Sequence, residues 1–478
     1  MHVRGIIILI CYHKLITLRP YKFHKKLINK YINRKTVLAF SIMYFQIVLK
    51  GVQTGFSSVM ISQLRDDNSD IKINSNQISW IASSIFLTCP IGAIISGWIM
   101  DRYGRLRSMQ LSMIPLIICF MWLWLAKSIT DLYIARITVG LTLGSGASAI
   151  CLYICETCTP SSRSFFLSLF NINQALGMIL STALMGWMTW RSTAEVFFIV
   201  TVVLTVLLFL VPESPGWLLN KGRQEESAKI CKWYGVPTPD ISSMSTAENK
   251  PHRISLKTLT RPEVWKPATL SVTFFFLQSA TGFSSSVIYL VDYTHRCKIP
   301  FDSVNAAIVL SVVRLIGSSI NSFILFNLKK KTLICISALG MVVSTATIAT
   351  MLRIYEDPLQ SPFPWLTFAC LCVYVLSAML GVSPLPFTFS SEVFPTSVGG
   401  VMMGITNSIA FGFMFLASNS FLMIVDAIGM EMYLWLCMGF SVALVLFGWF
   451  LLPETKNKTK DEITEYFIKK KNNNIRDA

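Results

Sequence analysis

Residues 97–106, GWIMDRYGRL, form a short charged segment between two long apolar runs. Its charges are Asp101, Arg102 and Arg105, and its two glycines permit close helix approach and a tight turn. Asp101 stands where a carboxylate can cap the helix that follows. Charged side chains next to a long apolar run are stabilised by pairing with opposite charges. The segment therefore predicts an ionic cluster at a turn between two helices.

Partners for this cluster follow later in the same half of the chain. Arg136 lies inside an apolar run, Glu156 comes at the end of that run, and Arg163 follows it. We expect Glu156 to contact Arg105 and Arg163, because half-buried charges need partners. Such contacts can form and break, so the sequence predicts a reversible latch.

Short signals of the first half recur in the second half at roughly constant offsets of about 230 residues, which suggests a duplicated unit. The recurring signals are PESP at 212–215 against PET at 453–455, Glu156 against Glu392, and Arg105 against Lys330. The expected gate residues outside the first segment are accordingly Arg136, Glu156, Arg163, Glu213, Lys330, Lys331, Glu392 and Glu454.

Long apolar stretches recur along nearly the whole chain, which has 478 residues and is 53% hydrophobic but only 14% charged. A stretch of about 20 apolar residues can satisfy its own backbone across a bilayer only as a helix. The predicted fold class is an all-α membrane protein with twelve transmembrane helices in two six-helix bundles. The predicted spans are 37–60, 77–99, 107–126, 131–155, 165–187, 193–212, 267–291, 303–327, 332–352, 365–389, 399–425 and 431–452.

A polar segment between the sixth and seventh spans divides the chain. We expect a basic cytosolic arm at 1–36, a first bundle at 37–212, a cytosolic linker with short helices at 213–266, a second bundle at 267–452 and a cytosolic tail at 453–478. Lys and Arg accumulate in cytoplasmic segments, and most of the 42 do so when both termini are cytosolic. The net charge of +17 thus reflects topology in a lipid bilayer, and no nucleic-acid partner is expected.

Eight motifs in this order together resemble the sugar porter branch of the major facilitator superfamily. The resemblance covers about residues 37–465, and GFSS (55–58) and NQISW (76–80) are also similar to insect facilitated trehalose transporters and glucose facilitators. The motifs are Gly97-x-x-x-Asp101-Arg102-x-Gly104-Arg105, Arg136-x-x-x-Gly140, Tyr153-x-x-Glu156, PESPGWLL (212–219), Gln278-x-x-x-Gly282, Pro384-x-Pro386, Glu392-x-Phe394-Pro395 and PETKNKTKDEI (453–463).

The resemblance implies a pore between two bundles that opens alternately to either side, with the charged cluster stabilising the outward-open state. It implies a small sugar as substrate, no cofactor, no metal, a monomer and the plasma membrane. Amide and hydroxyl groups suit a neutral, hydroxyl-rich solute. By register with the family, Gln278, Tyr289, Asn407 and Asn171 fall on substrate-site positions.

Four further positions depart from the family pattern. Ser279 stands where a second glutamine is expected, Ser284 where an asparagine is, and Phe387 where a tryptophan is. Arg314 falls on a sugar-contacting asparagine. A charge in mid-span indicates a functional site, so Arg314 either binds an anionic substrate or pairs with a carboxylate such as Asp292.

Three functions remain open at this level. The first is a facilitative uniporter for a sugar, trehalose or glucose; the second is a carrier of another small solute such as an organic anion, favoured by Arg314. The third is a sugar sensor that barely transports, favoured by the loop FNLKKK (326–331), which lacks the family's acidic residue and glycine. Ser57 stands where proton-coupled relatives carry an aspartate, which favours passive transport. The chain contains no nucleotide-binding loop of the GxxxxGK[ST] type, and we expect no enzyme.

Overall fold

The computed structural model describes residues 34–65, 71–158, 160–234, 261–324, 328–355, 362–395, 398–456 and 462–468. Within these ranges all regular secondary structure is helical. Most of the predicted N-terminal arm, the second part of the predicted linker and the end of the predicted tail lie outside the described residues. The bounds of the five predicted segments therefore stay predictions.

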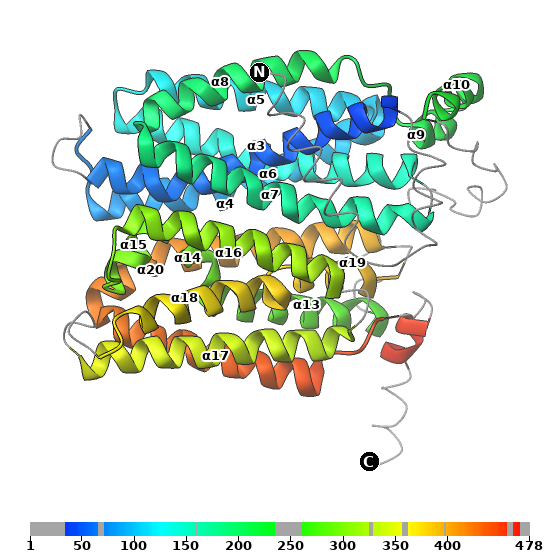
Figure 1. Ribbon diagram of the computed structural model, residues 1–478. Helices are drawn as coiled ribbons and strands as arrows, with labels where there is room; N and C mark the ends of the chain where they lie inside the picture. The colour runs from blue at the N-terminus through cyan, green and yellow to red at the C-terminus, as the bar shows by residue number, and fades with distance from the viewer. Residues whose placement is uncertain are drawn as a thin grey trace, which may run out of the picture.

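Six long helices form the first bundle, which is the upper half of Figure 1. Within it, α4 packs against α6, α3 against α7, and α5 against both α6 and α8. The bounds are α3 (Arg34–Arg65), α4 (Ser75–Tyr103), α5 (Arg105–Leu125), α6 (Ile129–Thr157), α7 (Pro160–Trp187) and α8 (Trp190–Leu208).

The second bundle is the lower half of Figure 1 and contains more broken helices. Here α17 packs against α18 and α20, and α13 packs against α20. The bounds are α13 (Pro262–Ala280), α14 (Phe283–Ile288), α15 (Leu290–Arg296), α16 (Ser303–Ile324), α17 (Lys330–Ile354), α18 (Trp365–Ser377), η2 (Ala378–Val382), α19 (Leu385–Val393), α20 (Gly399–Leu446) and η3 (Phe447–Leu451).

Ten helices in the described ranges are long and apolar enough to cross a membrane, and two further predicted spans are not counted separately among them. One lies within α20, whose 48 residues would measure about 72 Å, more than twice the bilayer core. Gly429, with φ 82°, interrupts α20 and separates two spans. The other is broken into α13, α14 and α15. The predicted twelve-helix fold is therefore confirmed.

The seventh span breaks because of one glycine. Gly282 has φ 80°, in the left-handed region that favours glycine. A Cβ atom there would lie 2.6 Å from Cys437 Sγ and 2.8 Å from the Tyr433 hydroxyl oxygen. The helix therefore ends at Ala280 and restarts as α14 at Phe283, so the backbone is not helical between these two residues.

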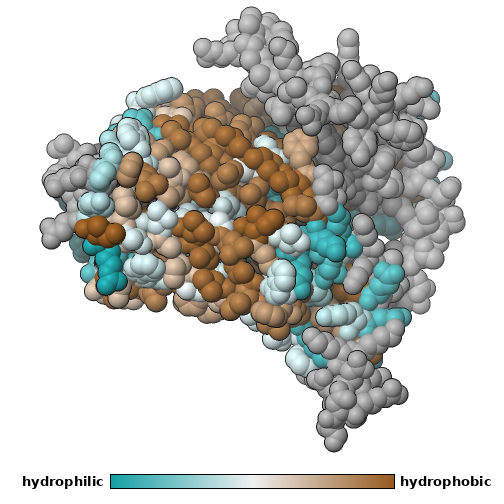
Figure 2. Space-filling view, turned by 60° about the horizontal axis from the view of Figure 1, so that its bottom comes forward, coloured by the Kyte–Doolittle hydropathy of each residue, from teal (hydrophilic) through white to brown (hydrophobic). Residues whose placement is uncertain are grey.

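The outer surface is mostly apolar between two polar rims. Figure 2 shows brown side chains across the middle of one face, with teal side chains at its edges. Large apolar side chains are strongly exposed on several helices, among them Ile94 at 70%, Phe209 at 70% and Phe450 at 72%. An apolar belt of this kind is stable against lipid and unstable against water, so the chain is a multi-pass membrane protein.

The two ends of the helices differ. One end carries the short helices α9 (Pro215–Asn220) and α10 (Gln224–Tyr234), at the right of Figure 1, and is called the linker end. Helical residues 462–468 dock there through the Phe467 carbonyl oxygen, which accepts a bond of 2.9 Å from Lys266 Nζ. The opposite end, which carries Arg65 and α15, is called the far end.

Candidate functional site

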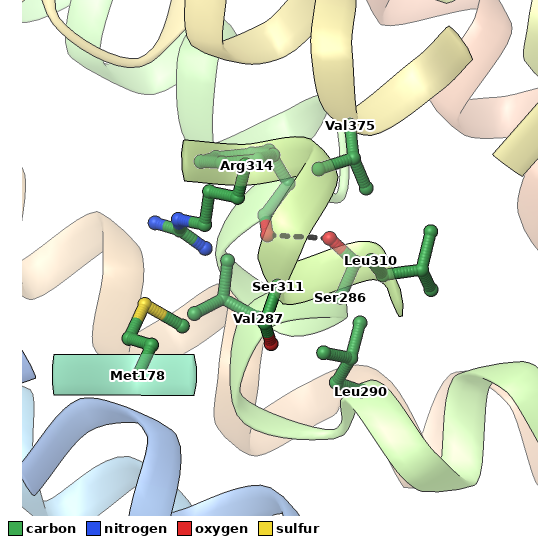
Figure 3. Close-up of a pocket in the computed structure, with 9 residues that line it drawn as sticks. Met178, Ser286, Val287, Leu290, Leu310, Ser311, Arg314 and Val375 are labelled. Carbon is green, nitrogen blue, oxygen red and sulfur yellow. Dashed lines mark hydrogen bonds between the residues drawn. The ribbon is translucent and has the colours of Figure 1, made fainter. Parts of the chain in front are cut away.

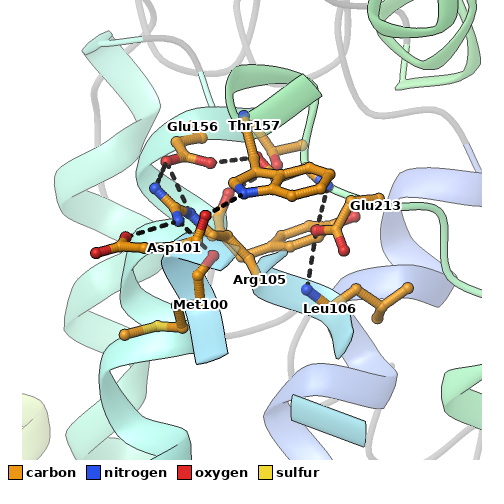
Figure 4. Close-up of polar contacts among 10 residues, drawn as sticks. Met100, Asp101, Arg105, Leu106, Glu156, Thr157 and Glu213 are labelled. Carbon is orange, nitrogen blue, oxygen red and sulfur yellow. Dashed lines mark hydrogen bonds and ion pairs between the residues drawn. The ribbon is translucent and has the colours of Figure 1, made fainter. Parts of the chain in front are cut away.

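At the linker end, the charged segment of the first half forms a compact cluster (Figure 4). Arg105 Nη2 lies 2.9 Å from Glu156 Oε1, and Arg105 Nη1 lies 3.3 Å from Asp101 Oδ1. The expected contact between Arg105 and Glu156 is present. The expected cap is wrong, because Gly104 precedes α5 directly and Asp101 instead lies in the last turn of α4.

A second carboxylate closes the cluster from the chain segment after α8. Glu213 Oε1 accepts a bond of 2.9 Å from the Leu106 backbone N–H, at the start of α5, where the helix dipole favours negative charge. The Ser214 hydroxyl donates to Glu156. Gly104 has φ 116°, and a Cβ atom on it would lie 2.3 Å from Glu213 Oε2. The linker is therefore tied directly to the turn between α4 and α5.

The second half repeats this arrangement position by position. Lys330 Nζ forms a salt bridge with Glu392, and the Thr455 hydroxyl donates to Glu392 at 2.9 Å. Glu454 accepts bonds of 3.3 Å from the backbone N–H groups of Lys330 and Lys331 at the start of α17. The hydroxyl donors Ser214 and Thr455 had not been predicted. The cluster forms although the preceding loop lacks the family's acidic residue.

A tyrosine pair anchors α10 to the first bundle. The hydroxyl oxygens of Tyr153 and Tyr234 lie 2.6 Å apart, and the Thr36 hydroxyl donates to the Tyr234 carbonyl oxygen at 3.2 Å. Burial raises the pKa of the Tyr234 hydroxyl, so the pair stays neutral at physiological pH. α10 is thus held against α3 and α6 at the linker end.

Several predicted gate residues lie elsewhere. Arg136 is wrong as a member of the linker-end cluster, because it lies 20 positions before Glu156 on α6, about 30 Å away. It is fully buried, and its side chain donates to the Ser57 hydroxyl and, at 3.0 Å, to the Ile81 carbonyl oxygen. Arg102 is exposed, with its guanidinium 5.4 Å from the Trp98 ring centroid.

The side chain of Arg163 lies outside the described residues. A Cβ atom on Gly97 would meet nothing within 4 Å, so this glycine makes no close helix contact. Lys331 places its ammonium 5.7 Å from the Trp449 ring centroid, at the surface of the second bundle.

At the far end, charged and polar contacts join the two bundles. Arg65 of α3 forms a salt bridge with Asp292 of α15. Asp292 also lies 3.3 Å from Arg296, which lies 2.8 Å from Asp426. Ser83 Oγ of α4 donates to Asn419 Oδ1 of α20 at 3.1 Å. No local motif predicted the two contacts between the bundles, because Arg65 and Asp292, like Ser83 and Asn419, are far apart in sequence.

Four predicted substrate residues of the second bundle share one property. Each carries a buried polar atom with no hydrogen-bond partner among the described residues, and the atoms are Gln278 Oε1, Ser279 Oγ, the Tyr289 hydroxyl oxygen and Asn407 Oδ1. Gln278 is held by its other end, because Nε2 donates to the Ser383 carbonyl oxygen at 3.0 Å. Unsatisfied buried polar atoms are rare in proteins and call for a ligand or water.

The other predicted substrate residues are less distinctive. Ser284 is buried on α14, and Asn171 is half-buried on α7. The Phe387 ring packs edge-on against Phe275 with centroids 4.9 Å apart. Phe387 therefore keeps an aromatic ring at its position, while no described contact brings Asn171 to the other site residues.

Arg314 lies beside a small cavity between the bundles, shown in Figure 3. Its guanidinium lies 5.1 Å from the Phe283 ring centroid. Met178 of the first bundle lines the opposite side of this cavity, whose free volume of about 10 Å³ holds about one water molecule. The suggested pairing of Arg314 with Asp292 is wrong, because Asp292 is bound by Arg65 and Arg296 at the far end.

The geometry defines a class of protein: a multi-pass membrane protein with two similar helical bundles, duplicated charged clusters at one end and polar groups between the bundles. Solved structures with the same fold include those of the xylose transporter XylE from E. coli. Its partially occluded inward-open form gives a TM-score of 0.74 at 19% identity, covering 89% of this chain and 100% of that chain. The form bound to 6-bromo-6-deoxy-D-glucose gives 0.71 at 18% identity, covering 90% and 99%. The fold is thus the major facilitator fold.

The family follows from the sequence comparison. The chain belongs to the sugar (and other) transporter family, which it matches over residues 37–467. It is 24% identical over 428 residues to the facilitated trehalose transporter Tret1 of Bombyx mori, covering 88% of this chain and 85% of the relative. It is 24% identical over 442 residues to the solute carrier family 2 facilitated glucose transporter member 8 of Mus musculus, covering 87% and 91%.

Proposed function

We propose that the protein is a facilitative sugar transporter that moves glucose or trehalose by alternating access. The observation that carries this proposal is the set of unsatisfied buried atoms on Gln278, Ser279, Tyr289 and Asn407. Sugar hydroxyl groups both donate and accept hydrogen bonds, so a bound sugar can satisfy amide and hydroxyl oxygens alike. The similarity to trehalose and glucose facilitators supports the same class of solute.

Alternating access is supported by where the bundles touch. Trp80 of α4 and Phe415 of α20 pack with ring centroids 5.7 Å apart near the far end, beside the Ser83–Asn419 bond. The charged clusters at the linker end each bind within one bundle. The bundles can therefore rock about a central site by breaking far-end contacts while both clusters stay assembled.

The proposed orientation places the linker end and both termini in the cytosol of the plasma membrane, following the distribution of Lys and Arg. The two bundles are in contact at the far end, which in this orientation faces the outside of the cell. We therefore interpret the structure as an inward-facing state. We further propose a monomer, since each bundle interface needed for transport is supplied within one chain.

Transport is proposed to be passive. Arg136 faces the Ser57 hydroxyl where proton-coupled relatives have an aspartate, so this pair offers no carboxylate to carry a proton. The second-half cluster of Lys330, Glu392 and Glu454 is assembled, which supports transport over a sensor that binds without moving its solute.

The test is uptake of radiolabelled glucose and trehalose into proteoliposomes containing the purified chain. Gln278→Ala and Asn407→Ala each remove one hydrogen bond to the sugar, so we expect the KM to rise roughly 2- to 10-fold. Gln110→Ala is the matched control, because this amide lies on α5 and donates to Leu208 within the first bundle. The proposal is contradicted if the unmodified chain shows no saturable uptake, or if Gln110→Ala raises the KM as much as the site variants do.

One observation favours a second candidate, a carrier of a small organic anion. The Arg314 guanidinium has no carboxylate partner among the described residues and lies in mid-span. Uptake of monocarboxylates without any uptake or binding of sugars would favour this candidate over the first.

A further inference from the structure

Arg314 lies on the face of α16 that packs inside the protein. Leu310 and Ser318, one turn before and one turn after it, are both buried, whereas Val312 and Ile316 on the opposite face are exposed. Arg314 is the twelfth of the 22 residues of α16, so it lies near the middle of the span. A charge at that depth is costly unless it is paired.

The structure supplies little compensation for this charge. Arg314 is half-buried, and its contact with the Phe283 ring is a cation–π interaction, which offsets only part of the cost of taking the guanidinium partly out of water. A guanidinium stays charged and presents five N–H donors. Among the described residues none of these donors has a recorded acceptor, and α16 itself contains no acidic residue.

The cavity beside Arg314 is lined by residues of both bundles. Met178 comes from the first bundle, and Ser286 and Ser311 come from the second. The two serine hydroxyls donate to carbonyl oxygens one turn back, Ser286 to Phe283 at 2.7 Å and Ser311 to Ala307 at 2.8 Å. Their oxygens therefore remain as acceptors for hydroxyl groups of a ligand. Figure 3 shows the guanidinium extending from α16 on the side where Met178 lies.

We propose that Arg314 makes this site selective for carbohydrates that carry an anionic oxygen group, a carboxylate or a phosphate. The flat guanidinium fork pairs with two oxygens of either group at once. The amide and hydroxyl atoms of Gln278, Ser279 and Asn407 take the sugar hydroxyls. This inference rests on the proposed transport of sugars and adds acidic sugars as the preferred substrates.

The α13–α15 segment links the two parts of this site. Gln278 and Ser279 lie in the last turn of α13, the break at Gly282 follows, and Ser286 of α14 lines the Arg314 cavity. One irregular span thus presents the hydroxyl-binding atoms and one wall of the anion site. A sugar acid fits this combination better than a plain organic anion, which offers no hydroxyls to the unsatisfied amides.

The experiment uses proteoliposomes with the full chain and four labelled probes: glucuronate, glucose 6-phosphate, glucose and trehalose. We expect glucuronate or glucose 6-phosphate to enter at least tenfold faster than glucose, and the faster acid identifies the anionic group. Arg314→Gln should lower uptake of that acid at least tenfold and leave glucose uptake equal or faster. Arg314→Lys should keep part of the acid uptake, because it retains the charge and loses the fork.

Arg353→Gln is the matched control, because Arg353 is an exposed arginine at the end of α17. Thermal unfolding of the purified unmodified chain gives a second readout that does not depend on the folding of a variant. The acid should raise the Tm, and glucose at the same concentration should not. Uptake of neutral sugars with no uptake and no Tm shift for either acid overturns this inference and leaves the sugar carrier standing. A Tm shift by an acid without uptake of any probe supports the anion site and overturns the carrier function.

Discussion

Arg65 of α3 and Asp292 of α15 form a salt bridge that crosses from one bundle to the other at the far end. Asp292 is shared with Arg296, which in turn binds Asp426, so four alternating charges form a chain at this end. The clusters at the linker end have no such crossing among the described residues. Opening of the far end must therefore break the bond between Arg65 and Asp292, whereas it leaves the clusters around Arg105 and Lys330 intact.

Arg65→Gln should shift the protein toward the state that is open at the far end. The two side chains are partly exposed, at 29% and 13%, so the bond contributes about 1 kcal/mol, a roughly fivefold change in the conformational equilibrium. The measurement is the rate at which a membrane-impermeant maleimide labels a cysteine placed at Asn419, which contacts Ser83 in the closed far end. Arg353→Gln, at the same end, should leave the rate unchanged. Equal labelling rates in the Arg65→Gln and unmodified backgrounds would show that the salt bridge between Arg65 and Asp292 does not hold the far end closed.

Gly104→Ala should destabilise the first cluster. Its φ of 116° is strained for any side chain, and the new Cβ atom would lie 2.3 Å from Glu213 Oε2. We expect a loss of about 1–3 kcal/mol of stability and slower uptake, measured by the Tm and by sugar flux. Gly97→Ala is the control: a Cβ atom there meets nothing within 4 Å, so its Tm should stay the same or rise slightly. A similar loss from both substitutions would contradict the assigned role of Gly104.

Glu156→Gln should cost more stability than Glu392→Gln. The carboxylate of Glu156 is 15% exposed and pairs with Arg105 at 10%, whereas Glu392 is 36% exposed. Losing the charge leaves Arg105 with only the 84% exposed Asp101 as counter-ion, at about 2–3 kcal/mol, against about 1 kcal/mol for loss of the more solvated Glu392 carboxylate. The two Tm values of the purified variants decide the order. A larger loss for Glu392→Gln would mean that the second cluster carries the greater part of the stability.

Ser57→Asp should convert passive uptake into uptake that responds to a proton gradient. Arg136 already donates to the Ser57 hydroxyl, so a carboxylate at this position would face a buried guanidinium that has no carboxylate partner among the described residues. In the unmodified chain an imposed pH gradient should leave initial sugar uptake unchanged, because this position cannot titrate. Ser57→Asn, which has a similar shape and no acid, should behave like the unmodified chain. A gradient effect in the unmodified chain would contradict the uniport mechanism.

Much of the linker end was predictable because its determinants are local or repeated. Arg105, Glu156 and Glu213 recur as Lys330, Glu392 and Glu454, and the repeat places each residue at the same helix end in both bundles. The need of half-buried charges for partners was enough to predict the salt bridge between Glu156 and Arg105. It was not enough to place Arg136. The sequence showed that this arginine lies within a span, but it did not show which residues of the neighbouring helices it contacts.

The twelve spans were readable from the chain alone, because a backbone in lipid must satisfy its own hydrogen bonds and so needs long apolar helices. The tertiary structure alone decided that Asp292 binds Arg65 across the bundles and that no carboxylate among the described residues pairs with Arg314. Arg65 and Asp292 are separated by 227 positions, and hydrophobic periodicity describes only neighbours along one helix. Which charges meet across two bundles depends on how the bundles pack, and packing depends on every contact between them at once.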